Sequence, residues 1–149
     1  MLNIRVEFFT NNIRFLTYYI FLIMKKQSIQ SAQAPKPIGP YSQAVLSGNT
    51  LYISGQLPYN VESEFLITTD MSHATKQVMD NIAAILHAAD MDFSHVVKCS
   101  IFVTDISQFA EVNAVYFNYF EAPFPARETI QVAALPMGAM VEISAIAVK

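Results

Sequence analysis

The chain has 149 residues, of which 53% are hydrophobic and only 14% are charged. These values indicate one globular domain with an ample core and argue against a disordered chain. With 9 Lys and Arg residues against 12 Asp and Glu residues, the formal net charge of -3 does not supply the basic face of a nucleic-acid-binding protein. The single cysteine, Cys99, excludes an intramolecular disulfide framework and a multi-thiolate zinc site, and it fits a reducing compartment, which we expect to be the cytoplasm.

The amino-terminal stretch differs in kind from the rest of the chain. Phe15–Met24 is an almost unbroken apolar run, but as a helix it would span only about half of the hydrocarbon thickness, so no membrane span is expected. It has the length of a signal-peptide core, and Ala32-Gln33-Ala34 offers a cleavage site, yet its nearest lysines follow the run instead of preceding it. We expect residues 1–23 to be an extension outside the fold and residues 24–149 to form one domain.

Local patterns predict a short succession of strands and helices after this stretch. In chain order these are a strand over Gln43–Ser47, a Gly48-Asn49 turn, a strand over Thr50–Ser54, a helix over Met71–Ala89 begun by Asp70, a strand over Val97–Val103, a helix with an apolar stripe from Phe109 to Phe120, a strand over Thr129–Leu135, a Pro136-Met137-Gly138 turn and a strand over Met140–Val148. This order favours an α+β fold, with a mixed sheet and both helices on one face. The other face carries little charge in these strands, so we expect other subunits to cover it.

The third predicted strand and the second helix carry finer expectations. Alternation in Val97–Val103 places Val97, Cys99, Ile101 and Val103 on one face, which makes Cys99 a buried and unreactive thiol. Asp105 or Ser107 is expected to cap the second helix, and Pro123 to end it.

Side chains able to bind a metal gather around the end of the first helix and the loop after it. They have no recognised metal-ligand spacing, which favours a solvated surface over a metal site. These residues are His87, Asp90, Asp92 and His95.

Two charged residues stand out in the last third of the chain. Arg127 follows Pro125-Ala126, and Glu142 is the lone acid of an apolar strand. Either the two serve a ligand, or Glu142 faces water and Arg127 pairs with it or with Glu128. Asn113, a polar residue on the apolar helical stripe, is likewise either a satisfied core amide or a ligand contact.

Five segments, in order and together spanning most of residues 25–149, carry a family resemblance. They read APKPIGPYSQ (34–43), YISGQLP (52–58), VNAVY (112–116), FPAR (124–127) and VEISAIAV (141–148). They resemble the RidA/YjgF family of imine and enamine deaminases. The resemblance implies a chorismate-mutase-like α+β fold, a homotrimer, and active sites in clefts between adjacent subunits.

The resemblance also implies roles for single residues. Arg127 matches the arginine that holds the substrate carboxylate, and Glu142 matches the glutamate that orients or activates water; the two are expected to converge at a subunit junction. Tyr41 is counted with them as catalytic, and the remaining substrate-binding positions are Ser54, Gly55, Asn113 and Thr129, the last standing where some members carry a cysteine.

The family reaction is the hydrolysis of 2-imino acids or their enamine tautomers, such as 2-iminobutanoate, 2-iminopropanoate and 2-aminoacrylate, to 2-oxo acids and ammonia. No metal or organic cofactor is implied, and neither nucleic acid nor a membrane is expected as a partner. Such intermediates leak from pyridoxal-phosphate enzymes, so the implied role is protective. A trimeric carrier or regulator that binds 2-oxo acids without turnover is the alternative, and RNA cleavage or translation inhibition is less favoured.

Two departures from the family pattern have structural consequences. Glu128 adds an acid directly after Arg127, and strand alternation should turn it away from the cleft. Asp90 replaces a common glycine after the first helix, where an aspartate tolerates the left-handed conformation.

Overall fold

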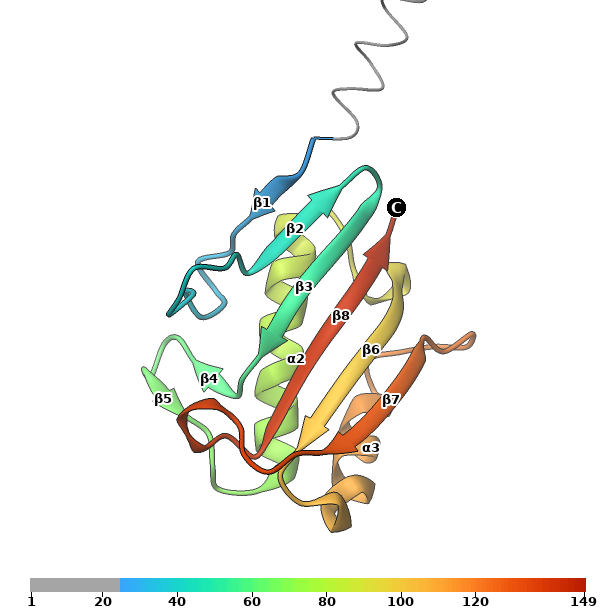
Figure 1. Cartoon of the computed structure of the whole chain (residues 1–149). Helices are drawn as coiled ribbons and strands as arrows, with labels where there is room; N and C mark the ends of the chain where they lie inside the picture. Colours follow the sequence, from blue (N-terminus) through green and yellow to red (C-terminus); the bar gives the residue numbers. More distant parts are fainter. Residues whose placement is uncertain (1–24) are drawn as a thin grey trace, which may run out of the picture.

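The computed structural model describes residues 25–149, so the predictions for residues 1–23 lie outside the described part of the chain. Its main sheet is built from β1 (Gln27–Ile29), β2 (Ala44–Ser47), β3 (Thr50–Gln56), β6 (Val96–Val103), β7 (Ala126–Gln131) and β8 (Val141–Val148). The sheet order is β1-β2-β3-β8-β6-β7, and only the β6–β7 pairing is parallel. Helices α2 (Met71–Ala88) and α3 (Phe109–Phe117) lie on the same side of this sheet (Figure 1). The predicted α+β class with a mixed sheet is therefore confirmed.

The first hairpin and the long helix follow the sequence closely. Gly48 adopts a φ of 62° in the turn, and Ser47 pairs with Thr50 across the hairpin. Asp70 caps α2 by accepting a hydrogen bond from the His73 N–H at 2.9 Å. Beyond the helix, Asp90 takes the left-handed conformation with a φ of 54°, as expected for an aspartate in that position.

The middle of the sheet has strand β8 between β3 and β6, and both neighbours run antiparallel to it. Helix α2 follows β3 and the β4–β5 segment (residues 59–66), leads to β6, and packs on β3 and β8, while α3 leads from β6 to the edge strand β7. The core therefore lies between the helices and one face of the sheet. Its largest fully buried side chains include Leu51, Met79, Ile85, Ile101 and Ile143.

Strand β6 corrects one prediction of burial. Cys99, Ile101 and Val103 are buried as expected, but Val97 is 48% exposed. The pairing of β6 with β8 shifts between Val96 and Lys98, so an extra residue enters the strand there. Such a bulge reverses the alternation that precedes it, and Val96 takes the inward place instead.

The second helix begins and ends differently from the prediction. Asp105 caps a short 3₁₀ helix, Ile106–Gln108, by accepting from the Ser107 N–H at 2.9 Å, and α3 continues from it without a side-chain cap of its own. The helix ends at Phe117, well before Pro123. The Asn118 side chain donates to the Ala114 carbonyl at 3.1 Å and so satisfies one of the last helical carbonyls.

The last strands were predicted with unequal success. Strand β8 and the turn Pro136–Gly138 are confirmed, but β7 covers Ala126–Gln131 instead of Thr129–Leu135. The pairing with β6 explains this, because all six residues of β7 pair with Lys98–Val103 and β6 ends there. The sequence did not predict β1, the small hairpin of β4 (Tyr59–Asn60) and β5 (Phe65–Leu66), or the 3₁₀ helix Phe93–His95.

The face of the sheet turned away from the helices, which we call the outer face, has no layer over it within residues 25–149 (Figure 1). It presents apolar as well as polar side chains: Tyr52 is 51% exposed and Ile130 is 47% exposed. No helix among the described residues is long and apolar enough to cross a membrane.

Candidate functional site

Arg127 lies on the helix side of the edge strand β7, where it pairs in register with Cys99. Its Nη1 donates a hydrogen bond to Asn113 Oδ1 at 2.9 Å. The guanidinium carbon lies 4.8 Å from the ring centre of Tyr116 and 5.5 Å from that of Phe109. No salt bridge joins Arg127 to an acid within residues 25–149. A neutral amide and two aromatic rings thus hold the guanidinium without neutralising its charge.

A hollow of about 360 Å³ opens beside this guanidinium. We call it the Arg127 hollow, and its lining residues are Asn113, Tyr116, Phe117, Phe124, Pro125 and Arg127. One unneutralised cation among apolar walls suits a small organic anion, because the guanidinium fork matches a carboxylate. Asn113 is exposed and bound to Arg127, so the interpretation of Asn113 as a satisfied core amide is wrong.

Tyr116 forms a buried part of the same hollow, with 4% of its surface exposed. Its hydroxyl has no hydrogen-bond partner of acceptable geometry in the described part of the chain. Burial and the neighbouring Cys99 raise the pKa of Tyr116 well above its usual range, so the hydroxyl stays protonated. Burial also raises the pKa of Cys99, in agreement with the predicted unreactive thiol.

Glu142 lies on the outer face of β8, with Gly55 directly beside it. A methyl group placed on Gly55 would fall 1.8 Å from Glu142 Oε1 and 2.7 Å from its carboxyl carbon, so this position needs a residue without a side chain. Gly55 sits where the β3–β8 pairing becomes irregular, between Ile53 and Gln56. Burial raises the pKa of the Glu142 carboxyl, and no ion pair to it occurs among residues 25–149.

Tyr41 and Ser54 accompany Gly55. Tyr41 and Gly55 line a second hollow, of about 440 Å³, between the loop around residue 35 and the end of β3. Tyr41 is 50% exposed, and its hydroxyl accepts from the Ile38 N–H at 3.4 Å. The Ser54 hydroxyl donates to the Ser42 carbonyl at 2.7 Å, so it ties the loop to β3.

Gln43 is a contributor to this region that the sequence analysis missed. Its buried amide donates to the carbonyls of Ser31, Ala34 and Pro35 at 3.1, 3.0 and 2.8 Å, and its Oε1 accepts from the Ser31 N–H at 2.7 Å. These bonds shape the loop that lines the second hollow. Gln43 ends the 34–43 segment that carries the family resemblance and directly precedes β2, but a glutamine in that place gives no sequence signal for such a role.

Arg127 and Glu142 lie on opposite faces of the sheet in one chain. Arg127 pairs with Cys99, which in turn pairs with Ala145, and Glu142 lies three residues before Ala145 in β8. The Arg127 and Glu142 backbones are therefore two strand spacings apart across the sheet and three residues apart along it, which amounts to about 14 Å. Because alternate residues point to opposite faces, the two side chains point apart. The structure therefore gathers the predicted site residues into two groups, one around Arg127 and one around Glu142.

Thr129 belongs to the Arg127 side of β7, two residues along the strand. Its hydroxyl is buried and has no hydrogen-bond partner within the described residues. Glu128 points to the outer face, where Lys98 and Ser100 donate to it and lower its pKa. The prediction that Glu128 turns away from Arg127 is confirmed, and the alternative in which Arg127 pairs with Glu128 or Glu142 is wrong.

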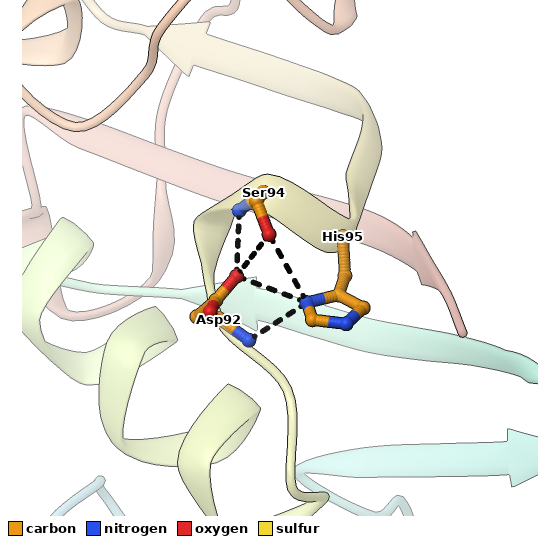
Figure 2. Close-up of polar contacts among 3 residues, drawn as sticks. All are labelled: Asp92, Ser94 and His95. Atoms are coloured by element: carbon orange, nitrogen blue, oxygen red, sulfur yellow. Dashed lines mark hydrogen bonds and ion pairs between the residues drawn. The ribbon is translucent and has the colours of Figure 1, made fainter.

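The histidines and acids near the end of α2 form a surface loop. Figure 2 shows Asp92 accepting hydrogen bonds from the backbone and hydroxyl of Ser94 while His95 reaches back to the Asp92 backbone, which is a capping box. No group of three metal-ligating side chains occurs in residues 25–149. His87, Asp90 and Asp92 are exposed, which confirms the interpretation as a solvated helix end and loop.

Comparisons with known proteins now identify the family. A protein-family model described as endoribonuclease L-PSP matches residues 31–149. The chain belongs to this family, also called RidA/YjgF. Among its RidA/YjgF relatives, the bovine 2-iminobutanoate/2-iminopropanoate deaminase is 50% identical over 124 residues, covering 83% of this chain and 90% of the bovine protein.

Solved RidA/YjgF structures share the fold over the same region. RidA from Psychrobacter sp. PAMC 21119 is 45% identical, with a TM-score of 0.79 and coverage of 83% of this chain and 99% of that one. TdcF of E. coli, solved with bound serine, is 35% identical, with a TM-score of 0.79 and coverage of 83% and 98%.

Proposed function

We propose that this protein hydrolyses reactive 2-imino acids and their enamine tautomers to 2-oxo acids and ammonia, in a site that a second copy of the chain completes. The observation that carries the proposal is the Arg127 guanidinium, which opens into a hollow without a carboxylate partner among residues 25–149. The bovine relative, named for the deamination of 2-iminobutanoate and 2-iminopropanoate, supports this reaction.

This hydrolysis depends more on the positions of the substrate and the attacking water than on strongly acidic or basic side chains. Arg127 binds the substrate carboxylate through two parallel hydrogen bonds and so fixes the adjacent C=N carbon. Water adds to that carbon of the protonated imine, and the resulting carbinolamine expels ammonia. Glu142 orients this water or accepts its proton, and its raised pKa brings it closer to the working pH than an ordinary glutamate.

The remaining site residues serve both sides of the cleft. On the Glu142 side, Gly55 leaves space for the carboxylate and offers its backbone N–H to the substrate, Tyr41 lines the hollow, and Ser54 holds the loop before it against β3. Asn113 orients Arg127, and Thr129 contributes a hydroxyl at the same strand.

A second copy is needed because Arg127 and Glu142 of one chain point away from each other. The uncovered outer face carries Glu142, and an edge strand of another copy would bring its Arg127 against it. We propose the homotrimer that the family resemblance implies, since a closed ring uses this head-to-tail contact in every copy and leaves none unpaired. We also propose a cytoplasmic, protective role, which suits a chain with one buried thiol.

The charge distribution supports a small anion over a nucleic acid as the ligand. Lys98 is engaged by Glu128, and Lys76 by Asp80 at 2.6 Å. A polyanion needs several unneutralised cations on one face. In the Arg127 hollow the charge comes from a single guanidinium.

Complementation between two impaired variants tests the proposal. Arg127→Ala is expected to abolish conversion of freshly generated 2-iminobutanoate and Glu142→Gln to slow it at least about 100-fold, while both leave the assembly intact. Mixed after co-expression in equal amounts, they should recover about a quarter of wild-type activity. This follows because most random trimers contain both variants, and each such trimer holds one junction with an intact Arg127 and an intact Glu142.

Two results would decide against the proposal. If the mixture stays inactive although mass spectrometry shows mixed trimers, the two residues do not share a site between copies. If the wild type binds 2-oxo acids but turns over no imine, the protein is a carrier and not an enzyme.

A further inference from the structure

The second hollow carries a sulfur atom that the proposed reaction does not use. Met137 lies in the turn before β8 and lines this hollow of about 440 Å³ together with Ile38, Tyr41 and Gly55. Met137 is 58% exposed. A thioether in such a place is open to small oxidants that arrive from the solvent.

The backbone holds Met137 in an uncommon conformation. Its φ of 58° lies in the left-handed region, which a residue with a side chain rarely adopts. Two backbone hydrogen bonds fix this turn. The Gly138 N–H donates to the Leu135 carbonyl at 3.2 Å. The Ala139 N–H donates to the Pro136 carbonyl at 3.1 Å. The turn therefore keeps the Met137 side chain at the hollow, at a cost in backbone conformation that is typical of functional positions.

Burial separates Met137 from the other sulfur atoms of the described chain. The Cys99 thiol is buried, and burial raises its pKa, so little of the reactive thiolate forms. Within residues 25–149 the other methionines are buried or half-buried: Met71, Met79, Met91 and Met140. Exposure therefore directs a peroxide to Met137.

We propose that Met137 is a site of reversible oxidation by hydrogen peroxide, and that its sulfoxide slows the reaction at the Glu142 side of the cleft. A lone pair of the sulfur attacks one peroxide oxygen and the O–O bond breaks. The proton on the attacked oxygen passes to the other oxygen, which leaves as water. The sulfur loses two electrons and the peroxide gains them. A reductase with two thiols reverses the step, since it forms a disulfide and releases the oxygen as water.

Oxidation changes the chemistry of the hollow beside Tyr41. It turns a flexible apolar side chain into a polar one whose oxygen accepts hydrogen bonds. The Tyr41 hydroxyl accepts from the Ile38 N–H at 3.4 Å, which leaves its own proton available to donate. We expect the sulfoxide oxygen to take this proton and to hold Tyr41 away from the substrate. The oxidation itself does not depend on the deaminase function, but its effect on the rate rests on that proposal.

The experiment treats the full chain with hydrogen peroxide, locates the added oxygen by peptide mass spectrometry, and measures kcat/KM for 2-iminobutanoate by semicarbazide trapping. Met137 should gain an oxygen before any other sulfur of residues 25–149. The value of kcat/KM should fall about fivefold, the effect of one displaced hydrogen bond. Methionine sulfoxide reductase with dithiothreitol should restore it. Met137→Gln, whose amide oxygen stands in for the sulfoxide, should be slow without peroxide.

Met140→Leu is the matched control, because Met140 lies three residues further along the chain and packs against the core. This variant should lose activity with peroxide as the wild type does, whereas Met137→Leu should keep the value of its own untreated sample. Tyr41→Phe should lose nothing further on oxidation, because it has no hydroxyl proton to donate. Comparison of each variant with its own untreated sample removes differences in basal rate.

Three results would overturn the inference. Oxygen uptake at Met140 or Cys99 ahead of Met137 would mean that exposure does not select the site. Full oxidation of Met137 with an unchanged kcat/KM would remove its effect on the reaction, and an equal loss in Met137→Leu would place the damage elsewhere. If the untreated wild type turns over no imine, the proposed function fails and takes the effect on the rate with it, while the mass spectra still decide whether Met137 is the selective, reversible site.

Discussion

Gly55→Ala provides a direct test of the Glu142 geometry. A methyl group at position 55 would lie 1.8 Å from Glu142 Oε1, where an ordinary contact needs at least 3.4 Å. The carboxylate must therefore retreat by about 1.6 Å, since it is the flexible end of a side chain whereas the backbone of β3 is fixed by its pairing with β8. The change displaces the proposed water-orienting group without removing it.

The expected cost of this displacement is mostly kinetic. A misplacement of about 1 Å in a catalytic constellation costs about 100-fold in rate, so kcat for 2-iminobutanoate should fall by about that factor. The free energy of unfolding should change by less than about 1 kcal/mol, because only the flexible end of the Glu142 side chain has to move and the added methyl restricts the unfolded chain.

Gly39→Ala is the matched control. A methyl group there meets only the ring of Tyr41, at an ordinary 3.6 Å, so activity should persist. Kinetics by semicarbazide trapping and thermal melts are compared for Gly55→Ala, Glu142→Gln and the double variant. If Gly55→Ala acts through Glu142, adding it to Glu142→Gln costs nothing further.

Two results would refute this reasoning. Full activity in Gly55→Ala would mean that the position of the Glu142 carboxylate is irrelevant to the rate. A double variant far slower than Glu142→Gln would mean that the methyl blocks the substrate itself and does not act through the carboxylate.

Two further variants probe the charge and the aromatic support of the site. Burial raises the pKa of Glu142, so the stability linked to this group is complete below its ordinary value of 4.5 and is lost as the pH rises through the raised pKa. Glu142→Gln should therefore gain stability relative to the wild type as the pH rises through this window, and melting curves from pH 4 to 8 that run parallel would contradict it. Tyr116→Phe keeps the ring under Arg127 and removes a buried hydroxyl whose neighbour, the Cys99 thiol, is a weak partner. We expect an unchanged KM and an unchanged or higher melting temperature, whereas a drop of several degrees would show that the hydroxyl is bonded.

The elements that the sequence predicted well are those whose causes are local. Helix α2 carries its apolar stripe and its Asp70 cap within its own residues, and the first hairpin carries its turn in Gly48. The small β4–β5 hairpin has strands of two residues, which leave no alternation to detect. Asn81 on α2 holds this region by donating to the Leu57 and Tyr59 carbonyls at 3.0 Å each, a contact between distant segments.

The end of α3 shows how a distant contact decides against a local signal. Phe120 continues the apolar spacing of the helix, which predicted helical structure up to Pro123. In the fold its ring packs on Phe93, with centroids 5.2 Å apart, and Phe93 belongs to a 3₁₀ helix that the sequence did not predict. The helix ends at Phe117, and Phe120 is nevertheless buried. The apolar spacing that continues to Phe120 therefore reflects burial of its ring and not a longer helix.

The placement of Arg127 and Glu142 on opposite faces of the sheet depends on strand register. A single sequence does not specify how one strand pairs with another, so this placement could not be predicted. Alternation within β7 separates Arg127 from Glu128, and alternation within β8 separates Glu142 from Ile143, but neither pattern relates one strand to the other. The relation comes through β6, where Cys99 pairs with both Arg127 and Ala145. A slip of one residue in either pairing would bring Arg127 and Glu142 onto one face. With the observed register they lie on opposite faces, so a reaction that uses both residues requires two copies of the chain, and the uncovered outer face is where the second copy would bind.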